Sequence, residues 1–444
     1  MSAAFWTNPS VIKFAKGSDP IETILGAART IVLNAIEDGW SGPPFDPFEL
    51  ARLRNIEVIP KEDVDEASLM SKGGRFAVSY NPQKPRTRVR FSVAHEVAHT
   101  IFPDCSDAVR FRKAPRSPRT DDWQLETLCN LAAAEFLMPI GTFSEIVGAD
   151  FGMEEVLNWR RQYGVSTEAM LLRLLHLGVP NLLIFSASTS DGKNYSVNYA
   201  LRRDGAIQKM YGRQLRRDSP VVHCTAIGYT EKGSSVLPGE TEAAEMECVG
   251  VAPYPNTVFP RVIGFARPRN GPQSSNSRLK VIRGDALSPR GGGPMILAHV
   301  VNDKAASWGA GFGKLMASRF PSAARHFREH IETHGRFKLG EILSTKADEN
   351  LTVVQLIAQH GYGESNSTRL RYVALRECLE KLAKVAIDAG ASVHMPRIGT
   401  GFGGGSWALI KELIDGEICC RGASVTVYSL GEADSPRSPQ PMLF

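Results

Sequence analysis

A stretch poor in apolar residues, RPRNGPQSSNS at 267–277, interrupts this chain of 444 residues. Proline, glycine, serine and asparagine dominate it and no apolar periodicity runs through it, which is typical of a linker. A chain of this length is too long for one ordinary core. We therefore expect each side of the linker to fold around a core of its own.

The composition is that of a soluble globular protein, with 43% hydrophobic and 22% charged residues. A net charge of +5 is compatible with a nucleic-acid partner but does not require one. Seven cysteines without framework spacing predict reduced thiols in a cytoplasmic protein. No apolar run approaches the ~20 residues of a membrane span, and the N-terminus lacks a signal-peptide pattern. We therefore expect no membrane partner.

Two regions precede the linker. Residues 1–180 are mostly helical, and RFAVSY at 75–80 is their one strand candidate. Between 181 and 266 short apolar segments alternate with turn residues, which favours a β-rich module whose role stays open. Its strand candidates are NLLIFSAS, YSVNYAL, VVHCTAIGY and RVIGFARP.

After residue 278, strands and helices alternate. The strand candidates are LKVI, MILAHVV, TVVQLIA, SVHMP and SVTVYSL. Such alternation predicts parallel strands joined by helices, and so an α/β/α sandwich over 278–430. The remaining residues, 431–444, have the composition of a loose tail.

The stretch RFSVAHEVAHTIFPDC at 90–105 contains two histidines four residues apart. Its apolar residues recur with helical period, so His95 and His99 share one helix face. Two such imidazoles can bind one Zn²⁺, with Glu96 near a metal-bound water. The same five-residue pattern arises by chance in unrelated helices, so a purely structural helix is the alternative.

A catalytic zinc needs a third protein ligand and an open fourth position. The next helical pattern, WQLETLCNLAAAEFLMP at 123–139, places Glu126 and Asn130 on one face. Its small residues allow two helices to approach closely. We predict Glu126 as the third ligand. Competing carboxylates nearby are Asp104, Asp107, Asp121, Asp122 and Glu135.

Together these two motifs resemble the ImmA/IrrE metallopeptidases over about residues 20–180. Arg88, Phe91 and Asn130 also fall at matching positions of the family pattern. The resemblance implies an α+β zincin-like peptidase domain with Zn²⁺ as cofactor and a repressor-like protein as substrate. The implied ligands are His95, His99 and Glu126, with Glu96 as the catalytic general base.

Two segments of this region have more than one interpretation. RFAVSY either pairs with an extended substrate backbone or is an ordinary core strand. Within 156–180, Ser166 can cap a helix that closes the peptidase fold or forms half of a helix-turn-helix. Three basic residues support the second interpretation: Arg160, Arg161 and Arg173. We favour the closing helix, because basic residues on a helix are usually only solvated.

A glycine loop follows the strand candidate SVHMP and precedes a helical pattern. Glycines there let backbone N–H groups approach a phosphate, and the helix adds its positive end. A second loop, NDKAASWGAGFGKLM, follows MILAHVV in the same manner. Two loops at strand ends suit a diphosphate above a parallel sheet, although tight turns explain most single glycine loops.

With Gly284 and Asp285, these loops resemble the macrodomains, which bind ADP-ribose. The resemblance spans about residues 278–430 and implies that Asp285 contacts adenine and Asn302 lies near the distal ribose. The loop residues implied around the diphosphate are Gly309, Gly311, Gly313, Gly399, Thr400, Gly401, Phe402 and Gly403.

The chain departs from the hydrolases of this macrodomain branch. Those enzymes use a lysine after the third strand and an aspartate in the second glycine loop. This chain has Gln359 and His360 in the first place and Gly403 in the second. The departures favour a reader over a hydrolase, while His360, Asp303 or Lys304 can act in another mechanism.

The two sites together predict sensing coupled to cutting. In the first interpretation, a cytoplasmic zinc endopeptidase cleaves a repressor or toxin-like regulator under control of ADP-ribose or a related nucleotide, in a stress or anti-phage response. In the second, an antitoxin-like protein removes ADP-ribose through its macrodomain and the zinc domain is regulatory. In the third, the peptidase fold binds a repressor without cutting it.

Overall fold

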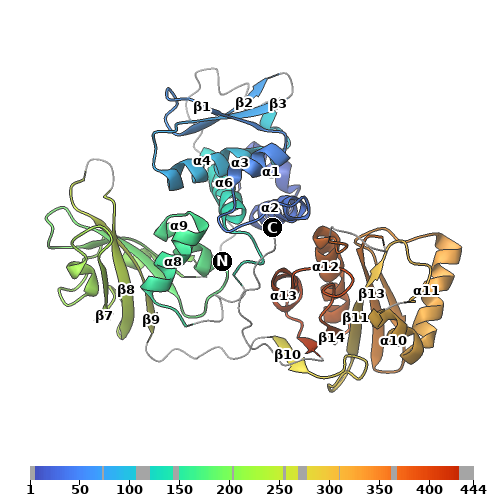
Figure 1. The fold of residues 1–444 in the computed structure, drawn as a ribbon. Helices are drawn as coiled ribbons and strands as arrows, with labels where there is room; N and C mark the ends of the chain where they lie inside the picture. The colour runs from blue at the N-terminus through green and yellow to red at the C-terminus, as the bar shows by residue number, and fades with distance from the viewer. Residues whose placement is uncertain are drawn as a thin grey trace. The chain divides into compact units, whose positions relative to one another are not determined.

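The computed structural model describes residues 6–72, 75–106, 121–143, 150–202, 205–253, 257–268, 278–309, 311–361 and 368–429 (Figure 1). The chain divides into two compact units. The first comprises Met1–Ala35, Gly39–Pro139 and Glu145–Ser274, and the second comprises Ile36–Asp38, Ile140–Ser144 and Ser275–Phe444. Within the described ranges, no helix is long and apolar enough to cross a membrane. Residues 269–277 of the predicted linker and the predicted tail 431–444 lie outside these ranges.

A small sheet in the first unit has the order β1-β3-β2, with β1 at Glu57–Pro60, β2 at Ala67–Lys72 and β3 at Arg75–Tyr80. RFAVSY is confirmed as strand β3, which pairs in parallel with β1 and antiparallel with β2. Of its two interpretations, the ordinary core strand is confirmed, and pairing with a substrate backbone is wrong because both of its edges carry strands. Strand β2 lies at the edge of the sheet instead. Strands β1 (EVIP) and β2 (ASLMSK) were not predicted, because neither segment alternates clearly between apolar and polar residues.

Five helices accompany this sheet: α1 (Pro9–Ala15), α2 (Pro20–Glu37), α3 (Pro47–Leu53), α4 (Arg86–His99) and α6 (Asp122–Leu137). Figure 1 shows α3, α4 and α6 beneath one face of the sheet. Small buried residues, Ala94 and Ala98 on α4 and Cys129 and Ala133 on α6, allow these two helices to pack closely. The packing of α4 on α6 brings the two sequence motifs together.

Helices α8 (Met153–Tyr163) and α9 (Thr167–His176) follow. Ser166 caps α9 as predicted, because its hydroxyl accepts a hydrogen bond from the Ala169 N–H at 3.1 Å. Arg173 is buried, and its Nη1 lies 2.8 Å from Glu135 Oε2 on α6. A guanidinium held in this way is not presented to a nucleic-acid phosphate, which favours the closing helix over a helix-turn-helix.

The middle sheet is antiparallel and six-stranded, in the order β6-β5-β4-β9-β8-β7. Its strands are β4 (Leu183–Ser188), β5 (Ser196–Arg202), β6 (Gly205–Ala206), β7 (Thr230–Val236), β8 (Ala243–Val251) and β9 (Arg261–Pro268). The β-rich character is confirmed, but a strand at VVHCTAIGY is wrong. A 3-10 helix, Pro220–His223, forms there because proline starts a helical turn and the Ser219 side chain caps it.

The second unit contains a six-stranded sheet in the order β10-β15-β14-β11-β13-β12. Its strands are β10 (Leu279–Arg283), β11 (Met295–Asn302), β12 (Ile342–Lys346), β13 (Leu351–Gln359), β14 (Ser392–Pro396) and β15 (Val425–Ser429). All pairs are parallel except β12 with β13. Each of the five strand candidates predicted here is confirmed, and β12 is an addition.

Helices cover both faces of this sheet. Figure 1 shows α10 (Gly311–Arg319) and α11 (Pro321–His334) on one side, and α12 (Tyr372–Asp388) and α13 (Trp407–Ile414) on the other. The central strands β11 and β13 are buried almost throughout, as expected for a parallel sheet covered on both faces. The unit therefore has the three α/β/α layers that the alternation predicts.

Candidate metal centre and glycine loops

The two histidines of α4 meet the carboxylate of Glu126 on α6. His95 Nε2 lies 2.9 Å from Glu126 Oε2 and 3.2 Å from His99 Nε2, and His99 Nε2 lies 3.7 Å from Glu126 Oε1. Ligands about 2.1 Å from a tetrahedral Zn²⁺ are separated by about 3.4 Å. Side chains from two helices are thus spaced as one divalent cation requires, and two imidazoles with a carboxylate are a donor set that zinc accepts.

Asn130 supports this arrangement from one turn further along α6. Its Oδ1 lies 2.9 Å from His95 Nδ1. An amide oxygen only accepts hydrogen bonds, so Nδ1 of His95 carries the proton and Nε2 keeps its lone pair for a ligand. The i, i+4 spacing of Glu126 and Asn130 was the sequence signal for this pair.

The charges at this centre are mutually dependent. Burial disfavours the charged form of Glu126, but hydrogen bonds and attraction from His95 and His99 outweigh it and lower the pKa of this carboxyl. Burial likewise disfavours the His95 imidazolium, yet the hydrogen bond and charge of Glu126 raise the pKa of His95. The lowered pKa favours the ionised carboxylate, which is the form that binds a metal.

Glu96 is buried beside the histidines and held by the edge strand. Its Oε2 accepts a hydrogen bond from the Leu69 N–H of β2 at 2.9 Å. Nothing in the local sequence at Leu69 signals this contact, because the donor is a backbone group brought in by the sheet. The bond holds one oxygen of the Glu96 carboxylate against strand β2.

Two of the competing carboxylates are engaged elsewhere. Asp104 accepts a hydrogen bond from the Ser10 hydroxyl at 2.7 Å, and Glu135 is fully buried against Arg173. Asp107 lies outside the described residues. Across the part of the chain that the structure describes, His95, His99 and Glu126 form the one group of three side chains positioned to hold a metal ion.

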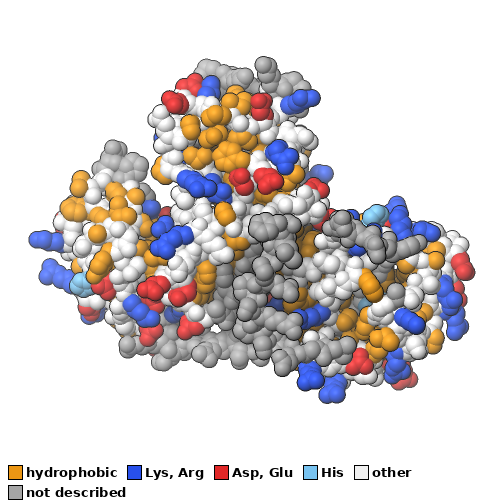
Figure 2. Space-filling model, in the orientation of Figure 1, with side chains coloured by type: hydrophobic (Ala, Val, Ile, Leu, Met, Phe, Trp, Pro, Cys, Tyr) orange, Lys and Arg blue, Asp and Glu red, His pale blue; other side chains and the backbone are white. Residues whose placement is uncertain are grey.

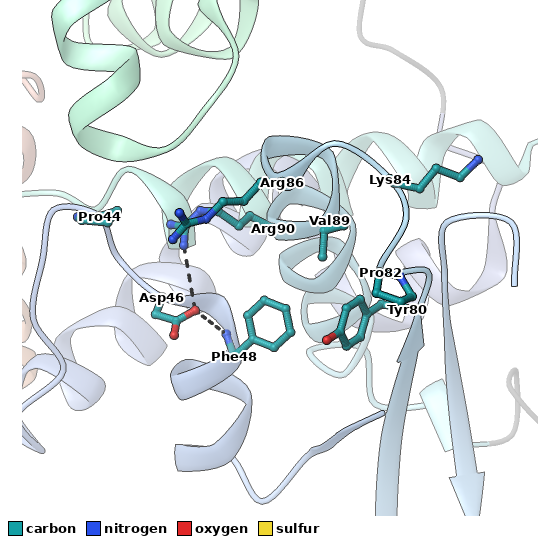
Figure 3. A pocket seen from close by; sticks show the side chains of 9 residues that line it. All are labelled: Pro44, Asp46, Phe48, Tyr80, Pro82, Lys84, Arg86, Val89 and Arg90. Atoms are coloured by element: carbon teal, nitrogen blue, oxygen red, sulfur yellow. Dashed lines mark hydrogen bonds and ion pairs between the residues drawn. The ribbon is translucent and has the colours of Figure 1, made fainter. Parts of the chain in front are cut away.

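A pocket of about 510 Å³ opens at the start of α4 (Figure 3). Its lining residues are Pro44, Asp46, Phe48, Tyr80, Pro82, Lys84, Arg86, Val89 and Arg90. Those on α4 precede His95 by five to nine residues, so they project roughly 140–240° around the helix from it. The pocket therefore lies on a different face of α4 from the candidate metal centre. Arg90 is buried and bonded to Phe45 O at 2.5 Å, which gives it a structural role.

The two glycine loops of the second unit come together. A Cβ on Gly311, at the start of α10, would lie 3.0 Å from the Phe402 ring of the other loop. Gly311 and Gly399 both have positive φ, and a Cβ on Gly403 would lie 2.6 Å from Gly399 O. By contrast, a Cβ on Gly309 or Gly401 would meet open space. Gly311, Gly399 and Gly403 are thus required by the conformation of the loops, whereas the backbone at Gly309 and Gly401 is open to a ligand.

The remaining predicted residues lie after strand β10, at the end of strand β11, in the loop after β14 and in helix α10. Asp285 follows β10, and its Oδ1 accepts the Leu287 N–H at 2.9 Å. Asn302 ends β11 and bonds through its amide to Gly361 O and to the Lys304 N–H. Thr400 donates to Arg397 O at 2.9 Å, Phe402 is 78% exposed, and Gly313 lies within α10. The roles of these residues in ligand binding remain predictions.

Basic and acidic side chains are interspersed on the face of the protein that Figure 2 shows. A nucleic-acid interface usually presents a basic stripe or patch. The mixed charge on this face agrees with the small net charge of +5.

Comparison with known proteins identifies two relationships. A family model, the IrrE N-terminal-like domain of peptidase family M78, matches residues 55–175. In the other region, a macrodomain protein of known structure from Streptomyces coelicolor is 34% identical, covering 34% of this chain and 99% of that chain with a TM-score of 0.31.

Two curated relatives are more distant. An ADP-ribose 1''-phosphate phosphatase from Lodderomyces elongisporus is 27% identical over 147 residues, 31% of this chain and 91% of that protein. A chromodomain-helicase-DNA-binding protein 1-like from Danio rerio is 28% identical over 166 residues, 35% of this chain but only 16% of that protein. Residues 55–175 thus match the IrrE N-terminal-like domain of peptidase family M78, and the other region of the chain is similar in sequence to macrodomain proteins.

Proposed function

We propose that this protein is a zinc-dependent endopeptidase that cleaves a regulatory protein, a repressor or a toxin-like protein, and that ADP-ribose or a related nucleotide bound to the macrodomain controls it. The supporting observation is the convergence of His95, His99 and Glu126 from two helices, with Glu96 buried beside them. The setting that suits such a protein is a stress or anti-phage response in the cytoplasm.

His95, His99 and Glu126 would hold the metal, and Asn130 would orient His95. A Zn²⁺ held there would supply a lowered pKa for its bound water and polarisation of the scissile carbonyl. Glu96 accepts the proton of the attacking water and passes it to the leaving amine. The Leu69 N–H keeps the Glu96 carboxylate oriented for this transfer.

The substrate backbone in this proposal lies along β2. An extended peptide adds to a sheet only where an edge is free. Among the described strands of this sheet, β2 and β1 are the edges, and β2 is the one bonded to Glu96. Pairing along β2 would bring the scissile bond towards the histidines.

The decisive experiment uses Glu96→Gln in the full chain. Glutamine keeps the size of the side chain and can accept the Leu69 hydrogen bond, but it does not take up a proton. We expect zinc content and unfolding temperature to stay unchanged, while cleavage of a protein or peptide-library substrate drops by at least ~10². Equal cleavage by the variant would remove Glu96 from the mechanism.

If the wild-type protein binds zinc but cleaves no substrate, the third interpretation is favoured, in which the peptidase fold binds a repressor without cutting it. A further candidate is the antitoxin-like protein in which the macrodomain itself removes ADP-ribose. The name of the Lodderomyces relative, a phosphatase acting on ADP-ribose 1''-phosphate, supports this candidate. Its chemistry depends on which groups of the macrodomain can activate water.

A further inference from the structure

Two of the seven cysteines meet in the middle β-rich module. Cys224 follows the 3-10 helix Pro220–His223, and Cys248 lies inside strand β8. Their sulfur atoms are 3.4 Å apart, and both side chains are fully buried in the core of the module. Both are free thiols. Two thiols from separate elements are thus in contact in a module whose role the sequence leaves open.

This contact can become a disulfide with little movement. The sulfur atoms of a disulfide are about 2.05 Å apart, so the two sulfurs need to approach by about 1.4 Å. Cys224 and Cys248 are 24 positions apart in the chain. A disulfide between them would therefore join a turn to a strand that the local sequence does not hold together.

Cys224 is the member of the pair that lies closer to solvent. Its neighbours in the chain, His223 and Thr225, are exposed, and so are residues 226–230. A local opening of this short turn would expose its sulfur. Cys248 lies in a strand that is paired with β7 on one side and with β9 on the other. It therefore stays covered until the sheet itself opens.

The two thiols also differ in acidity. A hydrogen bond with the Cys248 thiol lowers the pKa of Cys224 against the effect of burial, and backbone N–H groups of Glu231 and Gly250 add to this. The same contact, together with burial, raises the pKa of Cys248. The thiolate is the form of cysteine that reacts as a nucleophile. The more reactive thiol and the more accessible one are thus the same residue, Cys224.

We propose that Cys224 and Cys248 form a site of reversible oxidation, at which a hydroperoxide converts the two thiols into a disulfide. This site belongs to neither the candidate metal centre nor the glycine loops, so it goes beyond the proposed function. It gives the middle module a role in responding to oxidants.

The reaction has two steps, written here for hydrogen peroxide. The Cys224 thiolate attacks one peroxide oxygen, the O–O bond breaks, and hydroxide leaves and takes a proton from solvent to become water. Cys224 is then a sulfenic acid. The Cys248 sulfur attacks the Cys224 sulfur, the S–O bond breaks, and the leaving hydroxide takes the Cys248 proton to become a second water. Two thiols lose two electrons, and one peroxide gains them.

The disulfide would tie the turn at Cys224 to strand β8. The residue before Cys248, Glu247, accepts the Met153 N–H at the start of α8 at 2.6 Å and lies 2.8 Å from Lys232 Nζ on β7. Strand β8 is therefore anchored on both sides of the point where the disulfide would attach. A tie to such a strand restricts the opening of the turn.

The test treats the full chain with hydrogen peroxide and maps its cysteines by mass spectrometry after alkylation of free thiols in denaturant. We expect a pair of peptides linked through Cys224 and Cys248, and their separation by dithiothreitol. Amides of residues 221–229 should exchange at least ~10-fold more slowly in the oxidised protein. Cys420→Ser removes an exposed thiol outside the module and is the matched control, which should give the same linked peptides.

Two variants separate the roles of the thiols. Cys248→Ser should stop at a sulfenic acid on Cys224, which dimedone traps, because the second thiol is missing. Cys224→Ser should leave Cys248 reduced, with oxidation at least ~10-fold slower than that of Cys224 in Cys248→Ser. Absence of the linked peptides from oxidised wild-type protein would overturn the proposal. Oxidation of Cys248 at an equal rate in Cys224→Ser would also overturn it.

Discussion

Glu126 is the member of the candidate metal centre that comes from a second helix, and its carboxylate faces both histidines. Glutamine at this position keeps the shape but removes the negative charge that favours a divalent cation. We expect wild-type protein to retain about one zinc per chain after dialysis and Glu126→Gln to lose most of it, measured by elemental mass spectrometry. Asp122→Asn on the same helix is the control and should retain the metal. Full zinc in Glu126→Gln would assign the third ligand elsewhere.

Gly401 allows a test of the nucleotide site without damage to the loop. A Cβ at this position meets open space and φ is not positive, so a side chain fits. We expect Gly401→Glu to abolish ADP-ribose binding in calorimetry, because its carboxylate repels a diphosphate, while Gly401→Ala binds within ~10-fold of wild type. Gly403→Ala should weaken binding through the loop itself, since its Cβ would clash with Gly399 O. Wild-type affinity in Gly401→Glu would place the diphosphate elsewhere.

We expect a buried histidine on strand β11 to make the second unit sensitive to acid. His299 is 2% exposed with its ring 4.8 Å from that of Trp308, and burial lowers its pKa to about 3. The unfolded chain binds a proton below about pH 6.5, so it holds more protons than the folded chain between these values. Stability therefore falls as pH drops from 6.5 towards 3, by about 2 kcal/mol at pH 5.

Phenylalanine at this position keeps the aromatic contact and removes the titration. We expect the protection of β11 amides to fall between pH 7.5 and pH 5 in wild type by about 2 kcal/mol more than in His299→Phe. Hydrogen exchange, corrected for the intrinsic effect of pH, measures this at the level of one strand. His334→Phe on α11 should keep the wild-type slope. Identical slopes in wild type and His299→Phe would show that His299 does not cause the acid sensitivity.

For the molecule as a whole, the proposal links a ligand at one site to cleavage at another. Coupling requires that ADP-ribose bind the active and inactive states with different affinity, typically by 1–3 kcal/mol or roughly 5- to 150-fold. We expect the cleavage rate of the full chain to change within this range on addition of ADP-ribose. Gly401→Glu should not respond to the ligand. Binding by wild type without any change in rate would leave the macrodomain as a tether or a hydrolase.

The pattern of apolar residues in the sequence was sufficient to predict the strands and helices in which that pattern is regular. Each strand candidate after residue 278 formed, because buried parallel strands are nearly continuous apolar runs. The helix carrying His95 and His99 formed as its period predicts, and it ends at His99. The approach of Glu126 to that helix also followed from sequence, since small residues on α6 predicted close packing.

Tertiary structure alone decided the features that depend on partners distant in the chain. The edge position of β2 and the bond from Leu69 to Glu96 come from strand order, which local sequence does not encode. Asp303 and His360 are 57 residues apart in the chain, and their contact depends on a shift in register between β11 and β13. Periodicity predicts which face of an element is buried, whereas the partner of each polar group is chosen by the packing of whole elements.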